Sequence, residues 1–211
     1  MAMICPTITA FDTATFKLQI EQVRGFAKQI HIDLMDGQFA PTQSPPLSEV
    51  WWPHELVADI HLMYQKPMDY IDQLIKLKPR LVVIHNEAEV HHMDFAAKLH
   101  AHDIEVGLAL LQDTPVEWAH QIMHSFDHVL IFSGDLGRHG GTADLSLLDK
   151  VRYVREHHPD AEIGWDGGIN ADNARALVTA GVQILNVGGF IQQSDNPSNA
   201  YAKLEEVIKS S

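Results

Sequence analysis

Cysteine and basic residues are scarce in this sequence of 211 residues. Its one cysteine, Cys5, excludes an internal disulfide and a Cys-x-x-Cys zinc site, and it favours a reducing compartment. The 15 Lys and Arg residues are outnumbered by 28 Asp and Glu residues, so the net charge is −13 with histidine neutral. Such an acidic chain repels a phosphodiester backbone, and we expect no nucleic-acid partner.

Long apolar runs are also missing. No run approaches the roughly 20 residues of a membrane-spanning helix. The start, MAMICPTITAFD, has neither the basic region nor the sustained apolar region of a signal peptide. We therefore expect a cytoplasmic protein without membrane contact.

The hydrophobic residues, at 45% of the chain, are enough to bury a large core in one domain spanning residues 1–211. Short apolar runs alternate with amphipathic, helix-like segments. The eight runs are 3–8, 30–34, 57–63, 81–84, 106–111, 129–132, 161–165 and 184–187. The helix-like segments include 69–77, 93–101, 115–123, 145–156, 172–180 and 200–208.

This alternation predicts an α/β fold with a parallel sheet, and eight strands predict closure into a single (β/α)8 TIM barrel. The alternative is an open doubly wound sheet. That fold usually carries a G-x-G-x-x-G turn after its first strand, and this sequence has none there. In a barrel, functional side chains gather where the strands end.

Three polar residues lie at the ends of the second and third predicted strands. His31 and Asp33 are two residues apart and so share one face of a strand. His61 ends the next strand, and the three residues together suggest a divalent-metal site. Taken alone, His31 and Asp33 fit a neutralised His–Asp pair equally well. Asp59 has the same parity as His61, and we expect it lower in the barrel.

The seventh and eighth strands end in glycine-rich turns. Asp166 precedes Gly167 and Gly168, and we expect its carboxylate to face that of Asp33 across the barrel mouth. Two such carboxylates suit proton removal from one face of a small substrate and delivery to the other. Gly188 and Gly189, with Gly167 and Gly168, could present backbone N–H groups to a phosphate. The long loop 133–142 could form a lid.

Six segments, in this order and spacing, resemble the ribulose-phosphate 3-epimerase family along nearly the whole chain. They are HIDLMDGQFAP (31–41), DIHLM (59–63), VIHNEA (83–88), VGLALLQDTPVE (106–117), WDGGIN (165–170) and AGVQILNVGGFI (180–191). The resemblance implies a TIM barrel of the ribulose-phosphate-binding type and an isomerase of carbohydrate metabolism in the pentose phosphate pathway. It also implies a homo-oligomer.

The resemblance implies roles for individual residues. His31, Asp33, His61 and Asp166 would hold one divalent metal ion, with zinc, iron, manganese and cobalt all open. Asp33 and Asp166 would be the acid/base pair that epimerises C3 of a ketose phosphate, D-ribulose 5-phosphate to D-xylulose 5-phosphate, through a metal-stabilised enediolate. Substrate or phosphate contacts would come from Thr9, Met35, His61, Met63, Gly137, Gly140, Gly141, Gly167, Gly168, Gly188 and Gly189.

The residues that would contact substrate differ in places from the family pattern. The serine of the first strand is replaced by Ala10, and Thr9 supplies a hydroxyl only if the alignment shifts by one residue. A 3-epimerase of a hexulose 6-phosphate, such as allulose 6-phosphate, and a non-catalytic sugar-phosphate-binding barrel therefore stay as alternatives. A hexulose-phosphate synthase is disfavoured, because the third strand lacks the D-x-K-x-x-D run. His85 and Glu87 either line the mouth or pair with each other.

Overall fold

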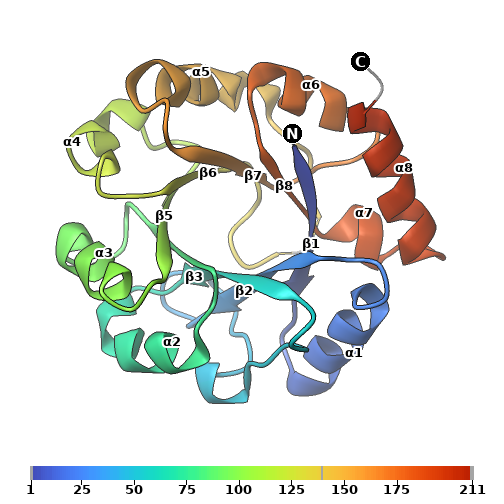
Figure 1. The fold of residues 1–211 in the computed structure, drawn as a ribbon, viewed down its shortest axis with the longest axis horizontal. Coiled ribbons are helices and arrows are strands. Elements are labelled where there is room, and N and C mark those ends of the chain that lie inside the picture. Colours follow the sequence, from blue (N-terminus) through green and yellow to red (C-terminus); the bar gives the residue numbers. More distant parts are fainter. Residues whose placement is uncertain (1, 139, 210–211) are drawn as a thin grey trace.

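The computed structural model describes residues 2–138 and 140–209, and eight parallel strands form a closed barrel in it (Figure 1). The strands are β1 Met3–Thr9, β2 Gln29–Met35, β3 Val57–Met63, β4 Leu81–His85, β5 Glu105–Leu110, β6 His128–Phe132, β7 Glu162–Asp166 and β8 Ile184–Val187. Each strand pairs with the next, and β8 pairs with β1. This closure confirms the predicted TIM barrel and excludes the open sheet.

Helices surround the barrel on all sides (Figure 1). The α-helices are α1 Thr13–Val23, α2 Ile71–Leu77, α3 His92–His100, α4 His120–Met123, α5 Leu148–His157, α6 Ala174–Ala180, α7 Gly189–Gln192 and α8 Pro197–Lys209. Short 3-10 helices are η1 Leu47–Glu49, η2 Pro67–Tyr70, η3 Val116–Ala119 and η4 Leu145–Leu147. None of these described helices combines the length and apolar character needed to cross a bilayer.

Two expected helices begin differently from the prediction. The segment 172–180 becomes α-helical only at Ala174, because the Asn170 side chain accepts hydrogen bonds from the backbone N–H groups of Asp172 and Asn173 and holds a turn there. The segment 115–123 forms η3 and only then α4. The predicted end after Ala180 is confirmed, since Gly181 takes the left-handed conformation with φ of 111°.

The strands bury both of their faces, as expected for a parallel barrel. Side chains such as Ile32, Ile60 and Phe95 pack in the core between the strands and the helices. Alternate strand residues point inward, where Leu81, Val83, Ala109 and Leu130 form a separate apolar cluster. The inward positions nearer the strand ends are therefore the places where polar groups must pair with one another or bind a ligand.

A charged cluster occupies the barrel around the starts of the strands. Arg80 donates two hydrogen bonds to Asp59, from Nε to Oδ1 at 2.8 Å and from Nη2 to Oδ2 at 2.7 Å. It also pairs with Glu105 at 2.9 Å and with Glu162 at 3.3 Å. Asp59 therefore lies lower in the barrel than His61, as expected from its position in β3, and it has a structural partner.

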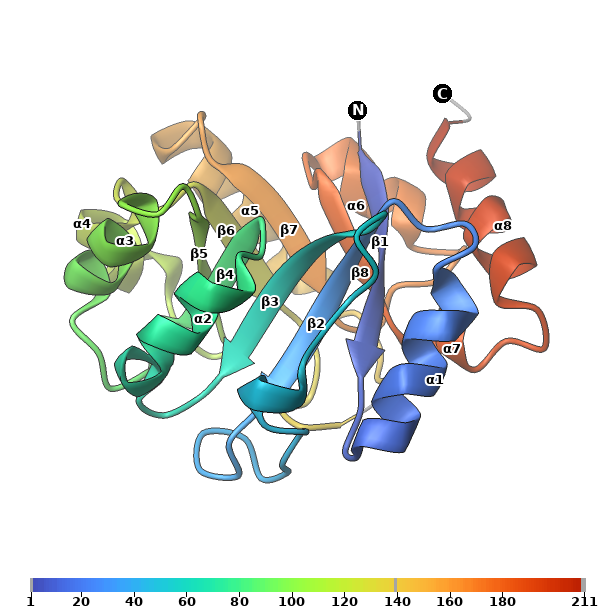
Figure 2. The same cartoon turned by 60° about the horizontal axis from the view of Figure 1, so that its bottom comes forward.

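The strand ends point to one side of the barrel (Figure 2). In the parallel register Thr9 pairs with Asp33, and Asp33 pairs with His61. These three residues therefore lie at the same height on adjacent strands. The register brings polar side chains of β1, β2 and β3 to one level at the mouth.

Candidate active site

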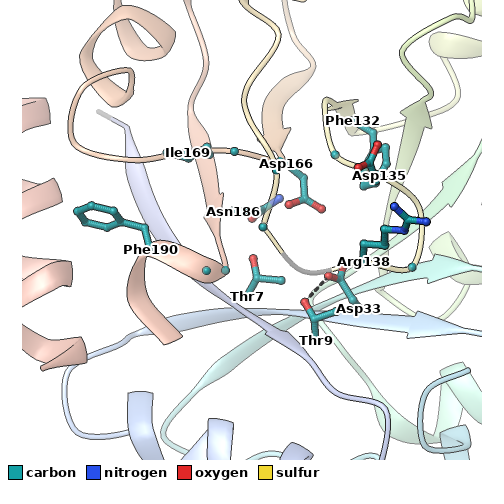
Figure 3. Close-up of a pocket in the computed structure, with 18 of the residues that line it drawn as sticks. Thr7, Thr9, Asp33, Phe132, Asp135, Arg138, Asp166, Ile169, Asn186 and Phe190 are labelled. Atoms are coloured by element: carbon teal, nitrogen blue, oxygen red, sulfur yellow. Dashed lines mark hydrogen bonds between the residues drawn. The ribbon is translucent and has the colours of Figure 1, made fainter. Parts of the chain in front are cut away.

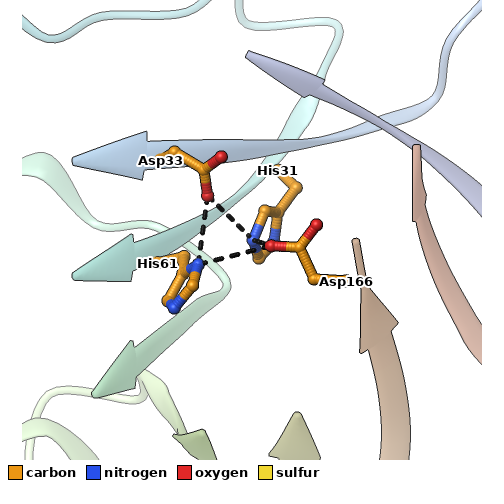
Figure 4. Close-up of side chains that lie close together, drawn as sticks. All are labelled: His31, Asp33, His61 and Asp166. Carbon is orange, nitrogen blue, oxygen red and sulfur yellow. Dashed lines mark hydrogen bonds and ion pairs between the residues drawn. The ribbon is translucent and has the colours of Figure 1, made fainter. Parts of the chain in front are cut away.

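Four buried side chains converge at the mouth of the barrel (Figure 4). His31 and Asp33 come from β2, His61 from β3 and Asp166 from the last position of β7. Each offers one ligand atom, and these atoms all lie within 4.8 Å of one another. No other group of His, Cys, Asp and Glu in the described part of the chain has this arrangement. The sequence predicted these four residues as a set.

The distances within this group suit a single divalent cation. His61 Nδ1 lies 3.0 Å from Asp33 Oδ1 and 3.6 Å from Asp166 Oδ2. His31 Nε2 lies 3.4 Å and 3.8 Å from the same two oxygens. Ligands about 2.1 Å from a tetrahedral ion are about 3.4 Å apart, within the observed range. The buried Nε2 of His31 also has no hydrogen-bond partner among the described residues. The donor set therefore fits a divalent metal ion.

The electrostatics of the group indicate the same affinity for positive charge. Burial opposes ionisation of Asp33, but the adjacent imidazoles of His31 and His61 hold the pKa of its carboxyl well below the usual range. Burial likewise opposes protonation of His61, but the carboxylates of Asp166 and Asp33 raise the pKa of its imidazole to about 9. The two carboxylates thus create a buried site that attracts a cation.

Thr9 supplies the hydroxyl of the first strand. Its Oγ1 donates a hydrogen bond of 2.7 Å to Asp33 Oδ2 (Figure 3), and this contact is buried. Ala10 packs instead in the core between strands and helices. Of the two positions that the sequence left open, Thr9 is therefore the one that faces the barrel mouth.

A cavity of about 410 Å³ opens above this group (Figure 3). Asp33 and Asp166 line it, together with most of the predicted substrate contacts: Thr9, Met35, Met63, Gly137, Gly140, Gly141, Gly167, Gly168, Gly188 and Gly189. His61, also expected to contact substrate, does not line the cavity and is fully buried. Its position suits a metal ligand.

The turn after β7 packs tightly against the loop after β6. A Cβ atom at Gly168 would lie 2.0 Å from the backbone nitrogen of Ala143, and Gly168 has a φ of 68°. A Cβ atom at Gly167 would lie 2.3 Å from the nitrogen of Gly134. These contacts hold the loop along the cavity, and only glycine allows them. His139, which belongs to this loop, lies outside the described residues.

Sequence reasoning missed two buried polar residues of the cavity wall. Thr7 and Asn186 both line the cavity, and Thr7 Oγ1 and Asn186 Oδ1 have no hydrogen-bond partner among the described residues. Thr7 pairs in register with His31, and strand parity could have indicated its inward direction. Arg138 and Asp135 also line the cavity (Figure 3), and Arg138 is the one basic side chain among its described lining residues.

The chain is similar in sequence to known proteins. The model of the family described as "Ribulose-phosphate 3 epimerase family" matches residues 3–191. The ribulose-phosphate 3-epimerase of Schizosaccharomyces pombe is 28% identical over 214 residues, covering 98% of this chain and 94% of that protein. The Bacillus subtilis enzyme of the same name is 29% identical and covers 97% of this chain and 98% of that protein.

Solved structures with less sequence similarity share the fold. The 3-hexulose-6-phosphate synthase from Salmonella typhimurium superposes with a TM-score of 0.72 at 12% identity, covering 99% of this chain and 98% of that chain. Orotidine 5'-phosphate decarboxylase from Pyrococcus horikoshii gives a TM-score of 0.68 at 14% identity, covering 99% and 100%. At these identities the likeness concerns the barrel alone.

Proposed function

Because the chain belongs to the ribulose-phosphate 3-epimerase family, we propose that it converts D-ribulose 5-phosphate to D-xylulose 5-phosphate by inverting C3. The observation that carries this proposal is the convergence of His31, Asp33, His61 and Asp166 beneath the cavity. The two carboxylates reach the cavity from β2 and β7, and so from different strands of the barrel. A bound sugar between them would present a different face to each.

We assign the metal site to those four residues. Two imidazole nitrogens and two carboxylate oxygens are compatible with zinc, iron, manganese or cobalt. When bound, a divalent ion would stabilise the negative charge that develops on the sugar oxygens as the C3 proton leaves. The histidines would act as ligands from below, because they are buried and do not line the cavity.

The proton transfers fall to Asp33 and Asp166. One carboxylate removes the proton from C3, and the other reprotonates C3 from the opposite face. Thr9 holds the Asp33 carboxylate through its 2.7 Å hydrogen bond and so limits its rotation. Met35, Met63 and Phe132 line the same cavity with apolar surface. Such surface keeps the exchanged proton away from bulk water.

The phosphate would lie at the glycine-rich side of the cavity. Gly167, Gly168, Gly188 and Gly189 place backbone along this wall, and the first N–H groups of a helix lack intrahelical partners. Arg138 adds positive charge from the loop after β6. This arrangement suits a dianion held some distance from the two acidic catalytic groups.

The test is an epimerisation assay with D-ribulose 5-phosphate on protein of measured metal content. We expect activity that falls on chelation and returns with added metal, and kcat/KM higher for the five-carbon substrate than for a hexulose 6-phosphate. Full activity in metal-free protein would contradict the metal site. A higher kcat/KM for the six-carbon sugar would reassign the substrate. Binding of ribulose 5-phosphate without turnover would mean a binding protein.

A further inference from the structure

A second buried histidine lies directly behind the proposed metal ligand His61. His85 ends β4, and its Nε2 lies 2.8 Å from Nε2 of His61. The two rings are stacked, with centroids 4.9 Å apart and an angle of 29° between their planes. Both side chains are fully buried. Phe39 packs on the His85 ring at a centroid distance of 4.7 Å, which holds the ring in place.

This contact fixes where the protons must be. Two ring nitrogens 2.8 Å apart can share one proton, because two N–H groups would repel each other. His61 turns its Nδ1 toward Asp33 and Asp166, so Nδ1 is the atom available to a metal. A neutral imidazole bound through Nδ1 carries its proton on Nε2 and donates it to His85. His85 must then keep its own proton on Nδ1.

Glu87 lies where an acceptor for that proton is needed. Its Oε2 is 3.5 Å from His85 Nδ1. Within residues 2–138 and 140–209, neither of these two buried atoms has a hydrogen-bond partner, and a slight approach of the two would satisfy both. The other carboxylate oxygen of Glu87, Oε1, accepts hydrogen bonds from the Leu111 backbone N–H and from the Thr114 hydroxyl. Glu87 is therefore held in place by the loop after β5.

A buried lysine fixes that loop in turn. Lys150 donates hydrogen bonds to the carbonyl oxygens of Leu111 at 2.6 Å, Gln112 at 2.8 Å and Thr114 at 2.8 Å. These contacts tie α5 to the segment that carries both donors to Glu87. Glu87, the acceptor for His85, is therefore held by a loop that is itself bound to α5.

We propose that His85 and Glu87 form a positioning pair for the metal ligand His61, fixing its tautomer and the direction of Nδ1. Glu87 accepts from His85 Nδ1–H, and His85 Nε2 accepts from His61 Nε2–H. Metal-binding histidines commonly donate their second N–H to a partner of this kind, and removing that partner weakens metal binding by about 10- to 100-fold. The inference rests on the metal site assigned under Proposed function.

Glu87→Gln tests the pair with little change in shape. The Leu111 N–H is a donor, so the amide oxygen of the new side chain must face it, and the NH2 group then faces His85. His85 Nδ1 must then accept from this NH2 group, so His85 carries its proton on Nε2. That N–H would face the Nε2–H of His61, and the two would repel each other. We expect the Kd for Zn²⁺ or Co²⁺, measured against a competing chelator, to be about 10- to 100-fold higher in Glu87→Gln than in the wild type.

Two comparisons separate positioning from general damage. Glu89→Gln makes the same change at an exposed residue two positions along, and should leave the Kd of the metal unchanged. His85→Gln retains an acceptor oxygen for the Nε2–H of His61, whereas His85→Leu has none. We therefore expect His85→Gln to bind the metal more tightly than His85→Leu. The visible absorption spectrum of Co²⁺ should differ from the wild type in Glu87→Gln and His85→Leu, because the ligand geometry changes.

The outcomes distinguish the two proposals. Wild-type protein that binds neither ion would refute the metal site itself, and this inference with it. Wild-type protein that binds while Glu87→Gln matches it in Kd and spectrum would refute the positioning pair alone. If Glu87→Gln fails to fold, equal metal affinities of His85→Gln and His85→Leu would refute the positioning pair.

Discussion

The Thr9 hydroxyl donates a 2.7 Å hydrogen bond to Asp33 Oδ2, while Asp33 Oδ1 faces His61 and His31. One oxygen of this carboxylate is thus directed to the proposed metal, and the other is held by a neutral donor from the neighbouring strand. The parallel register of β1 and β2, which pairs Thr9 with Asp33, creates this contact. It adds a positioning group to the site that contains the proposed acid/base pair.

Thr9→Val should lower kcat, because it keeps the side-chain shape and removes only the hydrogen bond to a charged group. Such bonds contribute about 1.5–3 kcal/mol, which corresponds to a loss of about tenfold or more. Steady-state assays with D-ribulose 5-phosphate measure the effect. Thr179→Val, which removes an exposed hydroxyl on α6, is the control. Unchanged kcat in Thr9→Val would show that the bond has no role in turnover.

Asp33→Asn and Asp166→Asn should each reduce turnover by about 10²- to 10⁴-fold, since each variant loses a group that moves a proton. Both should also bind metal more weakly. Asp135→Asn is a matched control, because Asp135 lines the same cavity but lies outside the group of four. Wild-type rates in Asp166→Asn would disprove the two-carboxylate mechanism.

Gly188→Asp should raise KM by about tenfold or more, because it places a carboxylate where we assign the phosphate, and like charges at short range repel by several kcal/mol. The site has room for a side chain, since a Cβ atom there would meet only the Cβ of Thr7, at 3.7 Å. Gly188→Ala separates bulk from charge and should change KM far less. Equal KM values in the two variants would place the phosphate elsewhere.

The charged cluster in the barrel should make stability depend on pH through Glu162. Burial opposes ionisation of Glu162, but His128 and Arg80 outweigh it and hold the pKa of its carboxyl below 4.5. A carboxyl with a lowered pKa stabilises the fold above its unfolded-state pKa, and this stabilisation is lost as pH falls through the folded-state value. Denaturant unfolding of Glu162→Gln should therefore show a larger deficit at pH 7 than at pH 4.

Glu105→Gln is the control of opposite sign at the same arginine. Burial and the neighbouring carboxylates of Glu162 and Asp127 raise the pKa of Glu105 despite its contact with Arg80. An acid with a raised pKa loses stabilisation as pH rises, so this variant should gain relative to the wild type between pH 4 and pH 7. The same trend in both variants would mean that Arg80 does not distinguish the two carboxylates.

Much of the architecture could be predicted from local patterns in the sequence. Each of the eight apolar runs became a strand with bounds within about two residues of the prediction, because burial on both faces selects continuous apolar residues. The end of α6 at Gly181 was also predictable from a local rule. The start of the helix near residue 172 was less so, since the Asn170 side-chain turn competes with the first helical turn, and the segment after Pro115 begins as a 3-10 helix.

The sequence by itself determined the barrel and the glycine-rich turns, because these follow from the alternation of apolar runs with helix-like segments and from the preference of glycine for positive φ. Strand parity indicated which polar residues end the strands, and the family resemblance implied that His31, Asp33, His61 and Asp166 act as one set. Only the tertiary structure decided that Thr9, not Ala10, faces Asp33. It also decided that His85 reaches His61 rather than only pairing with Glu87. Such contacts join side chains from different strands, and their distances depend on interstrand register and side-chain rotamers, which no local pattern encodes.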